Sequence, residues 1–165
     1  MEKRKSKDVY YLDIADAVSA RSTCLRRCYG AIIVLNDEII STGYNGAPRG
    51  RRNCIDLGHC TREELCIPSG ERYELCRSVH AEANAIISAA RRDMLGATMY
   101  LSGRDAVTGE LLGDATSCAM CRRQIINAGL ERVVIRRTPE EYEVVPVKDW
   151  IEADDSLAEE REETV

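Results

Sequence analysis

The sequence lacks phenylalanine and has only one tryptophan and two histidines among its 165 residues. Sites for nucleic-acid polymers usually combine basic side chains with aromatic ones on which the bases stack. The basic pairs in "RRNC" and "RRDM" have no aromatic neighbours of that kind, and the net charge is −5. We therefore expect no binding to polymeric nucleic acid.

Long apolar runs are also absent. None approaches the roughly 18 residues that a transmembrane helix needs, and the basic segment 1–8 is not followed by the apolar stretch of a signal peptide. We expect a cytoplasmic protein without membrane contact and with a single domain over residues 1–165. Its core should span about 8–137, and an acidic C-terminal extension, about 148–165, has the pattern of a solvated or frayed helix end.

Cysteine, in contrast, is abundant, with eight residues. In a reducing compartment, cysteines serve as metal ligands or catalytic thiols more often than as disulfides. The motif "CAMC" (118–121) has three interpretations: half of a zinc site, a redox pair, or two core cysteines. A redox pair usually follows the first strand of its fold, whereas this motif lies late in the chain. Metal binding is therefore the leading interpretation.

The hydrophobic pattern predicts alternating helices and strands. It indicates a helix over 8–21 with Asp8 as a cap, and a β-hairpin that turns at Asn36-Asp37. The later expected elements are a short helix at 61–66 within an irregular segment (47–78), a helix at 80–92, a strand at 97–103, a loop at 104–117, a helix at 118–128 ended by Gly129, a parallel strand at 131–137, a weak strand over "YEVVPV" and a terminal helix. This order predicts an α/β sandwich with a mixed sheet.

Three candidate metal ligands stand at the predicted starts of two helices. His80 begins one helix, and Cys118 and Cys121 begin another. Helix N-termini favour thiolates, and one nitrogen with two sulfur ligands suits a catalytic zinc that keeps one position for water. Glu82, two residues after His80, would lie beside the metal without binding it, where a proton shuttle belongs.

This combination resembles the zinc-dependent nucleoside and nucleotide deaminases, whose signature is H-x-E followed by P-C-x-x-C. "HAE" (80–82) matches the first half, while "TSCAMC" has Ser117 in place of the proline. Within that superfamily, the chain is most similar to the deoxycytidylate (dCMP) deaminases over about residues 8–137. The segments that carry this similarity are "STCLRRCYGAIIV", "STGYNGAPRG" and "INAGLERVVI".

The resemblance implies a three-layer α/β sandwich in which helices cover both faces of a mixed five-stranded sheet. It also implies zinc-dependent deamination of dCMP to dUMP and ammonia, supplying dUMP for thymidylate synthesis, with Glu82 moving the protons. Many members form homohexamers, and many are activated by dCTP and inhibited by dTTP, so Mg²⁺ bound with a nucleotide effector is a further expectation.

Two residues are candidates for substrate binding. Asn45 matches the family asparagine that binds the substrate sugar; its alternative role is that of a turn residue in "YNG". Arg26 is a candidate for the phosphate because a guanidinium group suits that anion. Its alternative role is that of an exposed arginine at a helix end.

The remaining cysteines suggest a second metal. Some dCMP deaminases carry a structural zinc with ligands at positions matching Cys24 and Cys54, and we expect Cys60 and Cys76 to complete the site. The alternatives are buried free thiols, or His59 or Cys66 in place of Cys60, while Cys28 is expected in the core.

Other functions stay open at this point. The same scaffold could serve a tRNA adenosine, nucleoside or free-base deaminase. A distinct class is a zinc module without catalysis, in which the cysteines are structural.

Overall fold

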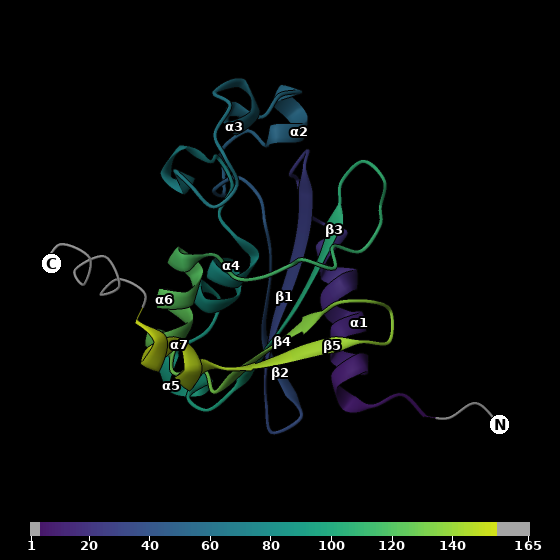
Figure 1. The fold of residues 1–165 in the computed structure, drawn as a ribbon, viewed down its shortest axis with the longest axis vertical. Coiled ribbons are helices and arrows are strands. Elements are labelled where there is room, and N and C mark those ends of the chain that lie inside the picture. Colours follow the sequence, from purple (N-terminus) through teal and green to yellow (C-terminus); the bar gives the residue numbers. More distant parts are fainter. Residues whose placement is uncertain (1–3, 155–165) are drawn as a thin grey trace, which may run out of the picture.

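The computed structural model describes residues 4–154 and contains one mixed five-stranded sheet (Figure 1). The strand order is β2-β1-β3-β4-β5; β3 and β4 are parallel, and the other neighbours are antiparallel. The strands are β1 (Arg27–Leu35), β2 (Glu38–Tyr44), β3 (Thr98–Asp105), β4 (Arg132–Arg136) and β5 (Tyr142–Pro146). The predicted mixed sheet and the parallel strand near 131–137 are confirmed.

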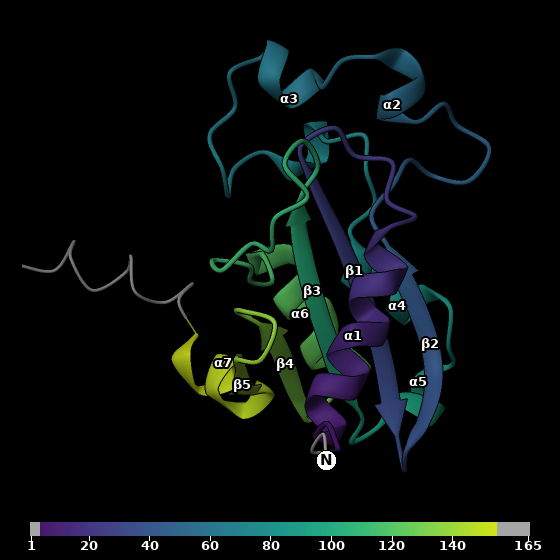
Figure 2. The same ribbon diagram turned by 90° about the vertical axis from the view of Figure 1, so that its right-hand side faces the viewer.

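Helices cover both faces of the sheet, as Figure 2 shows. They are α1 (Lys7–Ser19), α2 (Cys54–Leu57), α3 (Thr61–Glu64), a 3-10 helix η1 (Tyr73–Leu75), α4 (Ala81–Ile87), α5 (Arg91–Met94), α6 (Ala119–Ala128) and α7 (Val147–Ala153). Helix α1 lies on one face, and α4 and α6 lie on the other. The three-layer sandwich is therefore confirmed.

The hairpin between β1 and β2 turns at the predicted residues. Asn36 and Asp37 have φ angles of 53° and 63°. Two consecutive residues in the left-handed region form the tight turn that matches the twist of paired strands, and asparagine and aspartate tolerate it better than most side chains.

Helix α1 packs on its face of the sheet through a small apolar cluster, in which Tyr11, Leu12 and Ala15 meet strand residues such as Ile32 and Val134. The expected cap at Asp8 is wrong. Ser6 caps the helix by accepting a hydrogen bond from the Val9 amide (3.3 Å). Asp8 lies in the first turn and accepts a hydrogen bond from the Tyr100 hydroxyl of β3 (2.7 Å).

Three aspartates of α1 also form ion pairs with arginines of the sheet. The pairs are Asp8 with Arg132, Asp13 with Arg136 and Asp16 with Arg104. Arg104 holds Asp16 with two parallel hydrogen bonds of 2.7 Å each, the strong fork geometry of a guanidinium and a carboxylate. Helix α1 is thus held to the sheet by charge as well as by apolar burial.

The opposite face carries the larger core. Ala81 and Ala85 of α4, Met94 of α5 and Ile125 of α6 pack against sheet residues such as Leu101. Helix α6 ends at Gly129, which has a φ of 80° and confirms the predicted C-cap.

The single helix expected over 80–92 is wrong, because the chain forms two short helices there. At the end of α4, the Ser88 hydroxyl donates to the Asn84 carbonyl (2.8 Å), and Ala90 has an extended backbone. A serine that bonds back to the preceding turn competes with helix continuation. The break turns α5 so that Met94 becomes buried.

Segment 47–78 lies beyond one end of the sheet and contains α2, α3 and η1 (Figures 1 and 2). The short helix expected at 61–66 is confirmed as α3, whereas α2 and η1 were not predicted. Arg62 organises this segment. Its guanidinium is buried and donates to the carbonyl groups of Pro68, Glu71 and Arg72. Hydrogen bonds to the backbone therefore replace an apolar core here.

The structure describes the C-terminal part of the chain up to residue 154. Helix α7 includes the beginning of the predicted acidic extension, and residues 155–165 lie outside the described residues. Within residues 4–154, no helix combines the length and the apolar composition that a membrane span requires.

Candidate active site

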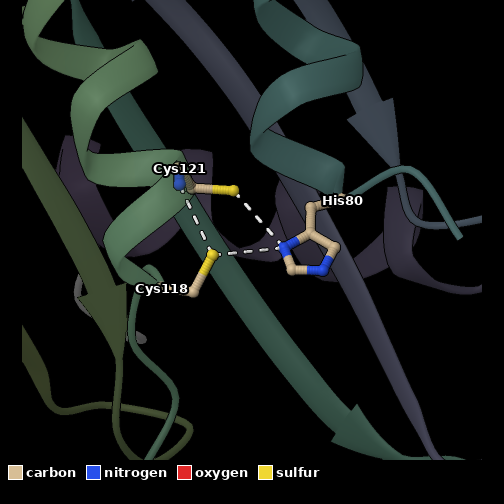
Figure 3. A group of neighbouring side chains, drawn as sticks. All are labelled: His80, Cys118 and Cys121. Carbon is tan, nitrogen blue, oxygen red and sulfur yellow. Dashed lines mark hydrogen bonds between the residues drawn. The ribbon is translucent and has the colours of Figure 1, made fainter. Parts of the chain in front are cut away.

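His80, Cys118 and Cys121 meet between the N-termini of α4 and α6 (Figure 3). The His80 Nδ1 atom lies 3.5 Å from Cys118 Sγ and 3.4 Å from Cys121 Sγ. Their ligand atoms all lie within 4.8 Å of one another. The predicted convergence of two helix starts is therefore present in the structure.

Local structure positions each of these side chains. His80 and Cys118 occupy the N-cap positions of their helices, with extended backbones. The Cys118 sulfur accepts a hydrogen bond from the Cys121 amide (3.4 Å), which caps α6 and directs both sulfurs to the same side. Free amide groups at a helix N-terminus stabilise a thiolate, the form in which cysteine binds metals.

The electrostatics of the three side chains agree with this. Hydrogen bonds from Cys121 and His80 hold the pKa of Cys118 well below its usual range. Hydrogen bonding to Cys118 and burial raise the pKa of Cys121, while hydrogen bonds to Cys118 and Cys76 raise the pKa of His80 to about 10. The cluster thus stabilises a thiolate at Cys118. One nitrogen and two sulfur donors fit a zinc ion.

Glu82 lies on the first turn of α4 and is only 4% exposed. Burial raises the pKa of its carboxyl group, while its own backbone amide, His80 and the Ser117 hydroxyl act to lower it. The carboxyl group is also close enough to Cys121 to raise the pKa of that thiol. Glu82 therefore lies beside the three candidate ligands, as predicted.

A pocket of about 130 Å³ opens at this cluster. Its wall includes His80, Glu82 and Cys118 together with residues of β1 and of segment 47–78. Tyr73 packs edge-on against the His80 ring, with 4.9 Å between the ring centroids, and the Arg62 guanidinium lies 4.6 Å from the centre of the Tyr73 ring. The irregular segment thus forms part of the pocket wall.

Asn45 lines the pocket but is mainly engaged in the scaffold. Its carbonyl oxygen accepts hydrogen bonds from the Tyr29 amide (2.8 Å) and the Ser22 hydroxyl (2.6 Å), and its amide donates to the Arg27 carbonyl (2.8 Å). These bonds tie the end of β2 to β1 and to the preceding loop. One amide hydrogen of the side chain is left for a substrate.

Arg26 also lines the pocket, with its Nε atom 3.2 Å from the Glu63 carboxylate of α3. Two further arginines, Arg27 and Arg62, lie in the same wall and were not predicted from the sequence. The only sequence signal for Arg27 was its position next to Arg26. No pattern indicated Arg62, because the segment that contains it has no apolar periodicity.

The four cysteines proposed for a second metal lie near one another without forming a compact group. Burial raises the pKa of Cys54, and the nearby thiols of Cys24, Cys60 and Cys76 raise it further. Among the described residues, His80, Cys118 and Cys121 form the only group of three or more such side chains whose ligand atoms come close enough together to hold a metal ion. Cys66 and His59 are exposed, and Cys28 is half-buried rather than in the core.

A comparison with protein families assigns residues 5–137 to the cytidine and deoxycytidylate deaminase zinc-binding region. The chain belongs to this deaminase family. The match contains all three candidate ligands and Glu82, and the donor set of the cluster agrees with the zinc site for which the region is named.

Relatives of this deaminase agree with the assignment. This chain is 39% identical over 132 residues to the deoxycytidylate deaminase of Mycobacterium phage D29, and the match covers 77% of this chain and 91% of that protein. It is 34% identical over 131 residues to the deoxycytidylate deaminase of Schizosaccharomyces pombe, covering 79% of this chain but only 37% of the longer yeast protein. The dCMP deaminase of cyanophage S-TIM5, solved with dCMP and dUMP, shares the fold with a TM-score of 0.53 and 23% identity, over 81% of this chain and 84% of that one.

Proposed function

We propose that this deaminase hydrolyses dCMP to dUMP and ammonia in a zinc-dependent reaction that supplies dUMP for thymidylate synthesis. The observation that carries the proposal is the convergence of His80, Cys118 and Cys121 beside the buried Glu82 in one pocket. The names of the relatives from Mycobacterium phage D29 and Schizosaccharomyces pombe support dCMP as the substrate.

His80, Cys118 and Cys121 would hold the zinc ion through one nitrogen and two sulfurs. Zinc in such a site supplies a hydroxide nucleophile at neutral pH. The amide groups at the start of α6 keep Cys118 as a thiolate, and the pair of helix N-termini directs the ligands to one point.

Glu82 takes a proton from the attacking water and gives it to the cytosine ring nitrogen N3. It then takes the proton of the new C4 hydroxyl group and gives it to the departing amino group. Attack at C4 and loss of ammonia then yield uracil. Burial raises the pKa of this carboxyl group, and a raised pKa favours proton exchange in both directions.

The polar side chains of the pocket would bind the nucleotide. Asn45 offers its remaining amide hydrogen to the sugar, while Arg26 is our candidate for the phosphate. Arg62 adds positive charge to the same wall, and it forms no ion pair with another described residue. A phosphate would provide the anion that this buried guanidinium lacks.

The proposal is tested by following ultraviolet absorbance during incubation with dCMP, cytidine, adenosine and tRNA. We expect dCMP to have a kcat/KM at least about tenfold above that of cytidine, because a charge-assisted contact contributes about 1.5–3 kcal/mol. Arg26→Ala should remove most of this preference, whereas Arg51→Ala, at an exposed arginine, should retain it. Equal efficiency on cytidine would indicate a nucleoside deaminase, turnover of adenosine or tRNA an adenosine deaminase, and no turnover a zinc module without catalysis.

We further propose a second, structural zinc bound by Cys24, Cys54, Cys60 and Cys76. The proximity of the other three thiols to Cys54 supports this, as does the position of Cys24, Cys60 and Cys76 in the wall of one pocket. Such an ion would tie segment 47–78 to the loop before β1. It would also hold Cys76 close to His80, whose ring it contacts.

The remaining expectations rest on the family. We propose a single domain over residues 1–165, assembly into a homohexamer, regulation by dCTP and dTTP, and Mg²⁺ bound with the nucleotide effector. A cytoplasmic location is part of the same proposal, because cysteines that serve as metal ligands are typical of a reducing compartment.

A further inference from the structure

The ring of His80 needs a contact that fixes its rotation. The N-cap position on α4 sets the direction of its Cβ atom, but the torsion that rotates an imidazole ring is broad and roughly two-fold. A half-turn of the ring would carry Nδ1 away from the sulfurs of Cys118 and Cys121, which lie 3.5 and 3.4 Å from it (Figure 3). The backbone alone therefore does not keep Nδ1 directed at the two sulfurs.

Tyr73 of η1 packs against this imidazole ring. The two ring centroids are 4.9 Å apart and the ring planes stand at 86° to each other. Edge-on packing at this distance is one of the preferred arrangements of two aromatic rings. Because the space around a closely packed side chain is filled, the tyrosine ring restricts rotation of the imidazole. Tyr73 and His80 also line the same pocket, so this contact lies at the candidate active site.

The ring of Tyr73 is itself held by two contacts within its own segment. Its hydroxyl accepts a hydrogen bond from the Gly70 amide (3.2 Å), and the Arg62 guanidinium lies 4.6 Å from the centre of its ring. Arg62 is only 4% exposed and is fixed by hydrogen bonds to the carbonyl groups of Pro68 (2.8 Å) and Arg72 (3.0 Å). A contact between a cation and a ring is stronger when the cation is shielded from water. The tyrosine ring is thus a fixed support.

We propose that Tyr73 is a positioning residue for His80, whose ring it holds in the orientation that directs Nδ1 to the two sulfurs. Arg62 in turn holds Tyr73, so the irregular segment 47–78 supports a metal ligand without supplying one to this cluster. Groups that orient the ring of a ligating histidine commonly raise the affinity of a site for its metal. The inference rests on the proposed zinc site, and its test measures metal retention rather than turnover.

Release of zinc from the loaded protein to a coloured chelator provides the measurement. Tyr73→Leu should release zinc about tenfold faster than the wild type, because its side chain no longer restricts the imidazole. Tyr73→Phe keeps the ring and should stay within about twofold of the wild type. Tyr10→Leu is the matched control, since the exposed Tyr10 makes an edge-on ring contact of the same kind with Tyr11 (5.1 Å). Equal release from Tyr73→Leu and the wild type would overturn the proposal.

Two further variants support this measurement. Tyr73 belongs to neither apolar cluster of the sheet, so Tyr73→Leu should fold. If it does not, Tyr73→Met fills the same space with a flexible chain and carries the test with the same expected result. Cys121→Ser removes one ligand of the candidate site and thereby identifies the phase of zinc release that belongs to it, in case the chain holds two ions.

Replacement of zinc by Co²⁺ gives a spectroscopic readout in the absence of substrate. The visible absorption of bound Co²⁺ depends on the arrangement of its ligands. We expect the spectrum to change in Tyr73→Leu and to be retained in Tyr73→Phe and Tyr10→Leu. Because no nucleotide is present, a change reports the support of His80 and not a contact between Tyr73 and the substrate. An unchanged spectrum in Tyr73→Leu would contradict the positioning role.

The outcomes separate this inference from the proposed function. Faster zinc release from Tyr73→Leu, together with a wild type that does not deaminate dCMP, would reject the proposed reaction and leave the role of Tyr73 standing. Unchanged release, together with turnover of dCMP by the wild type, would reject the role of Tyr73 alone. If Cys121→Ser leaves every phase of zinc release unchanged, the cluster holds no zinc and both proposals are overturned.

Discussion

Gly43 of β2 lies so close to Ala81 of α4 that a Cβ atom on the glycine would be 2.3 Å from the Ala81 carbonyl oxygen. The same atom would be 2.3 Å from the Ala85 amide nitrogen. Neither contact can be relieved by rotating a side chain, since both partners are backbone atoms. The distance between this strand and the helix that carries His80 and Glu82 therefore depends on the absence of a side chain at position 43.

Gly43→Ala should accordingly destabilise the fold by about 1–3 kcal/mol, the usual cost of overpacking, and displace α4. Zinc content and deaminase activity should fall together, because the displaced helix carries one proposed metal ligand and the proposed proton shuttle. Gly113→Ala is the control, since its Cβ would lie 3.7 Å from the nearest atom, an ordinary contact. Thermal unfolding and metal analysis check both variants; an unchanged Gly43→Ala protein would contradict the packing argument.

Glu82→Gln should keep the zinc content and lose turnover by about a hundredfold or more, the usual contribution of general acid–base catalysis. Glutamine has nearly the same shape but cannot exchange protons. Glu140→Gln, at an exposed position, should have the wild-type rate. Retention of the full rate in Glu82→Gln would show that another group moves the protons.

Cys54→Ser tests the second metal site. Metal analysis should find about two zinc ions per chain in the wild type and about one in this variant, with lower stability because structural zinc contributes to folding directly. Cys66→Ser, at the exposed cysteine, should keep both ions. A single zinc ion in the wild type would mean that Cys24, Cys54, Cys60 and Cys76 are free thiols, without affecting the catalytic site.

Asp13→Asn should change how stability depends on pH. Burial alone would raise the pKa of Asp13, but hydrogen bonds from Lys5 and Arg136 outweigh this and lower the pKa below the ordinary value of 3.8. A carboxylate with a lowered pKa stabilises the fold above that ordinary value, and the contribution is lost as pH falls through the pKa of the folded state.

We therefore expect Asp13→Asn to be less stable than the wild type by about 1 kcal/mol at neutral pH. The difference should shrink below about pH 4, where the aspartate becomes protonated. Asp93→Asn is the comparison, since its pair with Arg92 is exposed at 3.9 Å and should contribute less. Urea unfolding across pH 3–7 measures both; a difference that is constant over this range would contradict the role of the ion pair.

Several elements could be predicted from the sequence because their causes are local. Asn36 and Asp37 favour the tight turn of the hairpin, and Gly129 favours the left-handed end of α6. The spacing of "HAE" and "CAMC" placed His80 and Cys118 at helix starts, where capping geometry directs their side chains. Helix 80–92 failed because apolar periodicity continues through Ser88, whereas the hydroxyl of that residue bonds back to Asn84 and ends the helix.

The sequence by itself thus determined the hairpin, the alternation of helices and strands, and the two motifs that carry the candidate ligands, since each depends on residues within a few positions of one another. The tertiary structure alone decided which side chains form the rest of the pocket. Arg62 donates hydrogen bonds to carbonyl groups six to ten residues away, and its guanidinium lies over the ring of Tyr73. Tyr73 in turn packs against His80. The contact of Gly43 with α4 likewise joins segments that are distant in the chain, and periodicity carries no information about such contacts.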